Sequence, residues 1–140
     1  MDNLTKMKIF KPVADVFEAF VDPSKIGHFW FSSSSERWAK GKYITLKYDE
    51  YNAEGVIEVL EITDNQKIVF RWGQDGEGHT VTITFMETDP SSTVVEVRED
   101  GFDEKDVSQL IDNKEGWVYM LTCLKGYLEY GVNLRAALVK

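Results

Sequence analysis

A long apolar stripe near the C-terminal end of the sequence sets the strongest limit on the fold. Hydrophobic residues recur there at helix spacing, and Gly131 stands where a helix C-cap is expected. The members of the stripe are Val107, Leu110, Ile111, Trp117, Leu121, Leu124 and Leu128. A helix over residues 107–130 would be roughly 36 Å long, whereas a globule of this length has a radius of gyration of only about 14 Å. The helix must therefore cross the whole domain.

Before this stripe, the hydrophobic period changes to that of β-strands. Alternating segments bounded by turn residues predict strands at residues 7–10, 42–48, 55–62, 67–72, 80–85 and 93–99. Strands this close in sequence pair antiparallel. Because the chain has 140 residues, we expect one domain spanning residues 1–140. The predicted class is α+β, a curved antiparallel six-stranded sheet wrapped on the long helix.

Two short helices are expected between the first strand and the second. Pro12 opens a helical pattern that includes Val16 and Phe20, and Asp22-Pro23 restarts it with a cap and a first helical residue. Residues 32–40, which include four consecutive serines, are expected to form a polar loop. The two short helices would close one end of the sheet.

Composition excludes several classes of function. The net charge of −8 would repel a phosphate backbone, so no nucleic-acid partner is expected. The single cysteine, Cys123, excludes an intramolecular disulfide and a cysteine cage for a metal, and its apolar surroundings predict a buried, inert thiol. No window approaches the roughly 18 apolar residues of a membrane span, so we expect no membrane insertion and a cytoplasmic location.

Aromatic residues make up 13% of the chain, which is more flat, bulky surface than a compact core needs. A single helix leaves part of a curved sheet unfilled, and such hollows are typically apolar ligand sites. The residues expected to line this cavity are Trp30, Phe31, Tyr43, Phe70, Trp72, Phe85, Trp117, Met120, Leu121 and Leu124, with His79 at the rim. The same aromatic spacing also suits a solid core, and the sequence leaves both interpretations open.

Two glycines inside the long helix bear on the same question. Gly116 and Gly126 each disfavour the helix by about 1 kcal/mol relative to alanine. Their presence indicates either close backbone packing or space left beside the helix.

The sequence contains no motif that by itself carries a catalytic mechanism. The serine run lacks the strand-turn-helix context of a nucleophile elbow, and His28 and His79 lie too far apart to indicate a metal site. We interpret Glu99 and the acids that follow it as a solvated turn before the long helix. Gly76-Glu77-Gly78 is too short to cradle a phosphate. No catalytic residue, cofactor or metal is therefore predicted.

Several segments together resemble the START/Bet v 1-like, or helix-grip, superfamily. Phe17–Pro23 followed by Phe29-Trp30 is similar to its first two helices. Gly55–Val59 and Ile68–Trp72 are similar to central strands, and Gly116-Trp117 with Leu124–Glu129 to the last helix. The bacterial branch named after the C-terminal domain of the activator of the ninety-kilodalton heat-shock protein's ATPase is the most similar. The resemblance covers nearly the entire chain.

This resemblance implies a cavity between the long helix and the sheet that binds lipids, sterols or aromatic compounds. It implies wall positions for Trp30, Trp72, Trp117 and Met120. Two alternatives stay open: an interaction protein of the stress response that contacts a chaperone, and an enzyme acting on a cyclic or aromatic substrate. The enzyme would need a polar pair facing the pocket, with His79, Arg71 or Glu58 as candidates.

Overall fold

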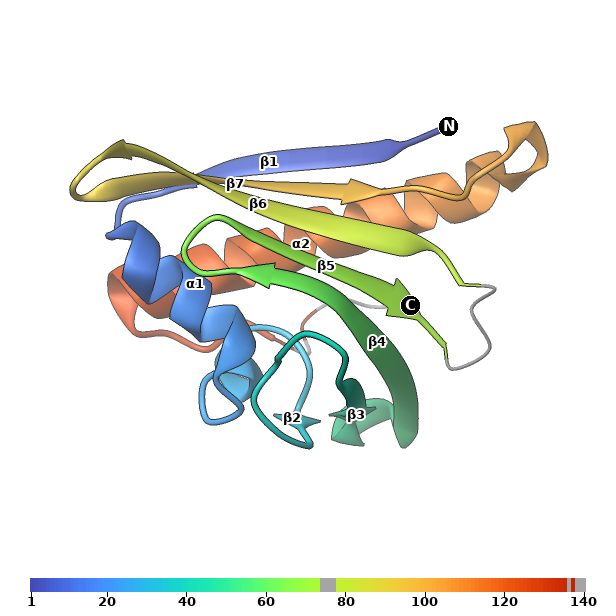
Figure 1. The fold of residues 1–140 in the computed structure, drawn as a ribbon, viewed down its shortest axis with the longest axis horizontal. Helices are drawn as coiled ribbons and strands as arrows, with labels where there is room; N and C mark the ends of the chain where they lie inside the picture. Colours follow the sequence, from blue (N-terminus) through green and yellow to red (C-terminus); the bar gives the residue numbers. More distant parts are fainter. Residues whose placement is uncertain (74–77, 136, 138–140) are drawn as a thin grey trace.

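The computed structural model describes residues 1–73, 78–135 and 137, and its main element is one curled antiparallel sheet (Figure 1). The strand order is β1-β7-β6-β5-β4-β3-β2, and every neighbouring pair is antiparallel. The strands are β1 (Asn3–Ile9), β2 (Ser33–Ser34), β3 (Tyr43–Tyr48), β4 (Ala53–Thr63), β5 (Lys67–Trp72), β6 (Thr80–Asp89) and β7 (Ser92–Glu99). The predicted α+β helix-grip fold is confirmed.

The prediction of six strands is wrong by one, because part of the expected serine loop pairs with the sheet. Ser33 and Ser34 lie opposite Lys47 and Leu46 of β3. The extra strand is two residues long and stands at the sheet edge, where it needs no apolar side chains. The pattern of apolar and polar residues therefore could not reveal this strand.

The first strand also begins earlier than predicted. Asn3 and Thr5 occupy buried positions of β1 but are polar. The alternation of apolar and polar residues that predicts a strand is therefore absent from this part of β1. Asn3 donates from its side-chain amide to the carbonyl of Leu110 at 2.9 Å, which connects β1 to the long helix.

Of the two predicted short helices, the first forms fully and the second forms as a single turn. α1 (Val13–Val21) buries Val16, Phe17 and Phe20. The next element, η1 (Ile26–His28), is one 3-10 turn. At Phe29 the backbone leaves the helical region, with φ −146° and ψ −12°, so Phe29 to Phe31 turn inward as an irregular segment. His28 stays exposed and stacks on Tyr127 at 4.6 Å between ring centroids.

α2 (Val107–Tyr130) is the long helix, and Gly131 ends it with a left-handed φ of 67°. One 3-10 turn, η3 (Glu104–Asp106), precedes it, and Asp103 caps that turn through the backbone N–H of Lys105. Figure 1 shows α2 running along the sheet, with its first turns reaching past the strand ends. Accordingly, Val107 and Ile111 are exposed, although the predicted stripe included them.

The core lies between the sheet, α1 and the second half of α2. Ile68 and Phe70 on β5 and Val81, Ile83 and Phe85 on β6 face it. The β4–β5 register shifts between Val59 and Glu61, so that Ile62 joins Ile57 and Val59 in packing on the core. Such a bulge sharpens the bend of a strand, and here it contributes to the curl of the sheet.

Candidate functional site

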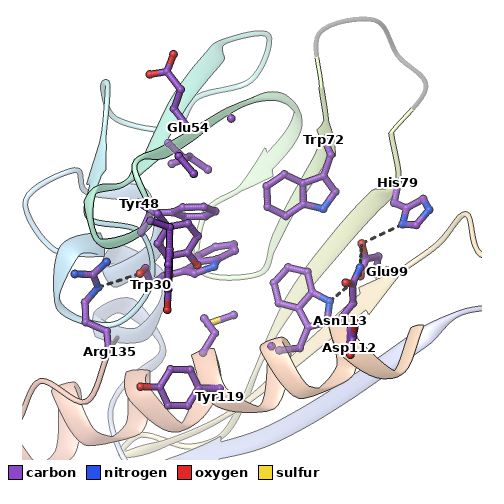
Figure 2. Close-up of a pocket in the computed structure, with 18 of the residues that line it drawn as sticks. Trp30, Tyr48, Glu54, Trp72, His79, Glu99, Asp112, Asn113, Tyr119 and Arg135 are labelled. Atoms are coloured by element: carbon purple, nitrogen blue, oxygen red, sulfur yellow. Dashed lines mark hydrogen bonds and ion pairs between the residues drawn. The ribbon is translucent and has the colours of Figure 1, made fainter. Parts of the chain in front are cut away.

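A cavity of about 850 Å³ lies between the first half of α2 and the curled sheet. That volume is within the usual range of small-molecule sites. Its apolar wall consists of Phe29, Trp30, Phe31, Leu46, Trp72, Trp117 and Met120. Its polar groups come mainly from Tyr48, Glu50, Glu54, His79, Glu99, Gln109, Asp112, Asn113, Tyr119 and Arg135 (Figure 2).

Four aromatic side chains form a continuous surface along the wall. The Trp30 ring meets Phe31 at 4.8 Å and Trp117 at 5.6 Å between centroids. Trp72 lies 6.2 Å from Phe31 and 6.5 Å from Trp117. These spacings are typical of favourable edge and tilted aromatic contacts. The wall is therefore a rigid surface whose rings already support one another.

The structure places the predicted wall residues in two groups. Those that line the cavity are Trp30, Phe31, Trp72, His79, Trp117 and Met120. Those that do not are Tyr43, Phe70, Phe85, Leu121 and Leu124, so these predicted positions are corrected.

The reasons for the second group differ. Phe70, Phe85, Leu121 and Leu124 are packed in the core and touch other side chains on all sides. Tyr43 is 52% exposed because β3 points Ile44, Leu46 and Tyr48 inward and Tyr43 outward.

The sequence left two explanations open for the glycines of α2, close packing or space beside the helix, and each glycine fits a different one. A Cβ on Gly116 would meet no atom within 4 Å, and this residue lines the cavity. A Cβ on Gly126 would lie 2.8 Å from Cδ1 of Leu134. Gly116 therefore leaves space beside the helix, and Gly126 allows close packing of the segment that follows it.

Glu99 forms the polar centre of one end of the cavity. Its side chain is 1% exposed. The indole N–H of Trp117 donates to Oε1 at 2.8 Å, and the Asn113 amide lies 3.2 and 3.3 Å from the two carboxylate oxygens. Nδ1 of His79 is 3.2 Å from Oε2. Figure 2 shows these groups converging on the carboxylate.

The sequence-based interpretation of Glu99 as part of a solvated turn is wrong. β7 continues through Glu99, and its inner face carries Val95, Val97 and then Glu99. The period of two along this strand was the signal that could have identified Glu99 as an inward residue.

Arg135 forms the polar centre of the opposite end (Figure 2). Its guanidinium donates to the Trp30 carbonyl at 3.0 Å, to the Ser32 hydroxyl at 3.1 Å and to Glu50 at 2.8 Å. The hydrogen bond from Ser32 lowers the pKa of Glu50, and although burial opposes this effect, the charge of Arg135 adds to it. This network connects the segment after α2 to the loop before β2. No sequence pattern indicated it.

Two phenols line this same end of the cavity. Burial raises the pKa of Tyr48 to about 12. Its hydroxyl, like that of any tyrosine at neutral pH, is protonated and can donate. The Tyr119 hydroxyl contacts the Leu134 carbonyl and accepts from the N–H of Ala137 at 2.9 Å. Nearby, burial raises the pKa of the Cys123 thiol, in keeping with the predicted buried thiol.

With this geometry described, comparison with known proteins identifies the family. The profile of the family described as activator of Hsp90 ATPase homolog 1-like protein matches residues 11–129. The chain belongs to this family. None of the curated protein sequences matches the chain. The predicted relation to the Bet v 1-like, activator-related proteins is confirmed.

Several solved structures share the fold. A protein of Staphylococcus saprophyticus is 58% identical, with a TM-score of 0.89 over 98% of both chains. The Aha1 dimer of Colwellia psychrerythraea is 16% identical, with a TM-score of 0.82 over 94% of this chain and 98% of that one. DynU16, a protein in the dynemicin biosynthetic locus, is 24% identical, with a TM-score of 0.80 over 94% of this chain and 48% of its own.

Of the three residues named for a possible catalytic pair, the cavity contains one. His79 lines it beside Glu99. Arg71 and Glu58 pair with each other at 2.6 Å and are not part of the wall.

Within residues 1–73, 78–135 and 137, no three His, Cys, Asp or Glu side chains are grouped to hold a metal. In the same part of the chain, no helix is long and apolar enough to cross a membrane.

Proposed function

We propose that this protein is a binding module that holds a small hydrophobic ligand, aromatic or lipid-like, in the cavity between α2 and the sheet. The observation that carries the proposal is the cavity of about 850 Å³ with its wall of tryptophan and phenylalanine. Gly116 supports it, because a helix former at that position would stabilise α2, yet the chain keeps a residue that leaves room.

The wall fits a flat ligand better than a flexible one. The Trp72 and Trp117 rings are tilted by 33° to each other, and Trp30 meets Trp117 edge-on at 63°. Rigid rings offer large contact area and lose little rotamer freedom when a ligand binds. Because the family's fold serves many ligands, the ligand class follows from these side chains rather than from membership.

Thermal unfolding of the purified protein against a panel of ligands tests the proposal. The panel contains fatty acids, sterols, flavonoids and other polycyclic aromatics. A ligand present at 100 times its dissociation constant adds about 2.7 kcal/mol to the free energy of unfolding, which raises the midpoint by several degrees. We expect a rise with one chemical class only. No rise with any compound, in protein free of co-purified ligand, would overturn the proposal.

A second candidate is an interaction protein that contacts a chaperone. Membership of the activator family favours it, and the net charge of −8 offers an acidic surface for a basic partner. The test is a pull-down with the purified heat-shock chaperone at low and high salt, together with the chaperone's ATPase rate. This candidate predicts a salt-sensitive complex and a changed rate. Absence of binding at low salt would contradict it.

A further inference from the structure

Building on the proposed binding function, we propose that Glu99 accepts a hydrogen bond from a hydroxyl or amine group of the ligand. The cavity would then select hydrophobic ligands that carry such a donor at one end and discriminate against anionic ones. The proposal stands on the position of Glu99, on the length of three of its four hydrogen-bond contacts and on the charges around the cavity.

Glu99 occupies a position that the fold would fill more simply with an apolar residue. It follows Val95 and Val97 on the inner face of β7, and both valines are fully buried. A buried carboxylate is unfavourable unless it is paired and fully hydrogen-bonded. Because Glu99 is only 1% exposed, core packing alone does not explain a carboxylate at this position, and we infer a role in ligand binding.

Three of the four hydrogen-bond contacts that Glu99 makes within the protein are long. Only the bond from Trp117 is short, at 2.8 Å, whereas Asn113 and His79 lie at 3.2 Å or more. Charge-assisted bonds to a carboxylate are usually about 2.7–2.9 Å long. A carboxylate can accept about four hydrogen bonds, and the contacts of Glu99 already reach that number. A ligand donor would therefore replace one of the long contacts from Asn113 or His79 and leave the bond from Trp117 in place.

The electrostatic surroundings favour a donor and disfavour an anion. Among the described residues, no lysine or arginine forms an ion pair with Glu99, and His79 is its one titratable partner. Three other carboxylates line the cavity, from Glu50, Glu54 and Asp112. The cavity's one arginine in the described chain, Arg135, is already bound to Glu50 at 2.8 Å. An acidic ligand would add repulsion at both ends.

The aromatic wall directs a flat ligand toward this carboxylate. Trp117 bonds Glu99 through its indole N–H while its ring faces Trp30 and Trp72. Figure 2 shows Trp72 and Glu99 on the same side of the cavity, away from Arg135. A ring system resting on Trp72 and Trp117 would therefore present its edge to the Glu99 carboxylate and its long contacts.

A matched series of pyrenes tests the proposal by direct fluorescence titration at one ionic strength. The probes are 1-hydroxypyrene and 1-aminopyrene, which carry a donor, 1-methoxypyrene, which has none, and 1-pyrenecarboxylate, which is anionic. We expect wild-type protein to bind the two donor probes about tenfold more tightly than the methoxy probe, since hydrogen bonds to charged groups are the stronger ones. The carboxylate should bind most weakly. This series needs no variant.

Glu99→Gln then assigns the preference to one side chain. Glutamine keeps the shape and an acceptor for Trp117 but removes the charge. We expect affinity for 1-hydroxypyrene to fall about tenfold, while affinity for 1-methoxypyrene stays within about twofold and the carboxylate binds better. The control is Glu96→Gln, on the same strand but in ion pairs with Lys6 and Arg98 outside the cavity wall. It should leave all four affinities unchanged.

The outcomes separate this inference from the proposed function. Equal affinity for the hydroxy and methoxy probes in wild-type protein overturns the role of Glu99 and leaves the pocket standing. An equal loss for both probes in Glu99→Gln, with the thermal midpoint preserved, overturns it as well. Failure of every pyrene to bind wild-type protein contradicts both the inference and an aromatic-binding cavity.

Discussion

The two halves of α2 belong to one helix but face different interiors. The first half presents Gln109, Asp112, Asn113 and Gly116 to a cavity. The second half presents Leu121, Cys123 and Leu124, all fully buried, to a packed core. Trp117 and Met120 stand at the boundary and line the cavity while being at most 5% exposed.

The difference shows that the cavity comes from the side chains of α2 as much as from the curl of the sheet. Amide and carboxyl side chains cannot fill an apolar interior without unpaired polar groups, so the first half of the helix lines a cavity and contacts β1 and β7 through hydrogen bonds instead of apolar packing. The second half has apolar residues at the equivalent positions and packs closely. One straight helix thus supports a ligand site and a core at the same time.

The largest expected effect concerns the core half. Leu124→Ala should lower the free energy of unfolding by about 2–5 kcal/mol, because it removes a fully buried side chain and leaves a cavity. Urea unfolding measures the change. The control is Val118→Ala, because Val118 lies on the same helix and is 41% exposed. Its free energy of unfolding should stay within about 0.5 kcal/mol of wild type. A loss below about 1 kcal/mol for Leu124→Ala would contradict the assignment of this half to the core.

The next effect concerns the cavity half. Gly116→Phe should fill the space beside the helix and weaken binding of 1-hydroxypyrene at least tenfold, about 1.4 kcal/mol. The free energy of unfolding should change by less than about 1 kcal/mol, because nothing lies within 4 Å of the new Cβ. Val118→Phe adds the same ring on the exposed side and should leave binding intact. Unchanged binding by Gly116→Phe would place the ligand elsewhere.

A smaller effect compares the two glycines directly. Gly116→Ala should stabilise the protein by about 1 kcal/mol, the usual difference in helix propensity. Gly126→Ala should gain less, because its Cβ would lie 2.8 Å from Leu134 and 3.3 Å from Val132, which must shift. Parallel urea titrations measure both. Equal gains at the two positions would show that Gly126 is not closely packed.

The smallest effect concerns the ion pair that connects the end of the chain to the cavity. The pKa of Glu50 is lowered from 4.5 in the folded state, so its contribution is complete above that pH and is lost as the pH falls through the lowered value. Glu50→Gln should therefore destabilise at neutral pH, by less than about 1 kcal/mol.

The measurement is urea unfolding of wild-type protein and Glu50→Gln over a pH series. Their difference should shrink toward zero as the solution is acidified below 4.5. Arg135→Gln breaks the same pair from the other side and should cost at least as much at neutral pH, because it also removes the bonds to the Trp30 carbonyl and the Ser32 hydroxyl. A difference that is constant with pH would contradict the role of the pair.

Prediction from the sequence succeeded where one side-chain period governs a whole element. β5 and the body of β6 follow strict alternation, and α2 begins and ends where its stripe and Gly131 indicated. It failed where backbone pairing or a buried polar group decided the outcome. Ser33–Ser34 form a strand without apolar residues, and Asn3 and Glu99 are polar residues on the inner face.

The sequence by itself determined the long helix, the strands that carry strong alternation and the abundance of aromatic residues, because each of these follows from local periodicity or composition. Only the tertiary structure decided which aromatics form a wall and which a core, since that depends on strand phase and on the bulge in β4. It also decided that Glu99 and Arg135 stand at opposite ends of one cavity. These two residues are 36 positions apart in the sequence, and no local pattern encodes their placement around the same cavity.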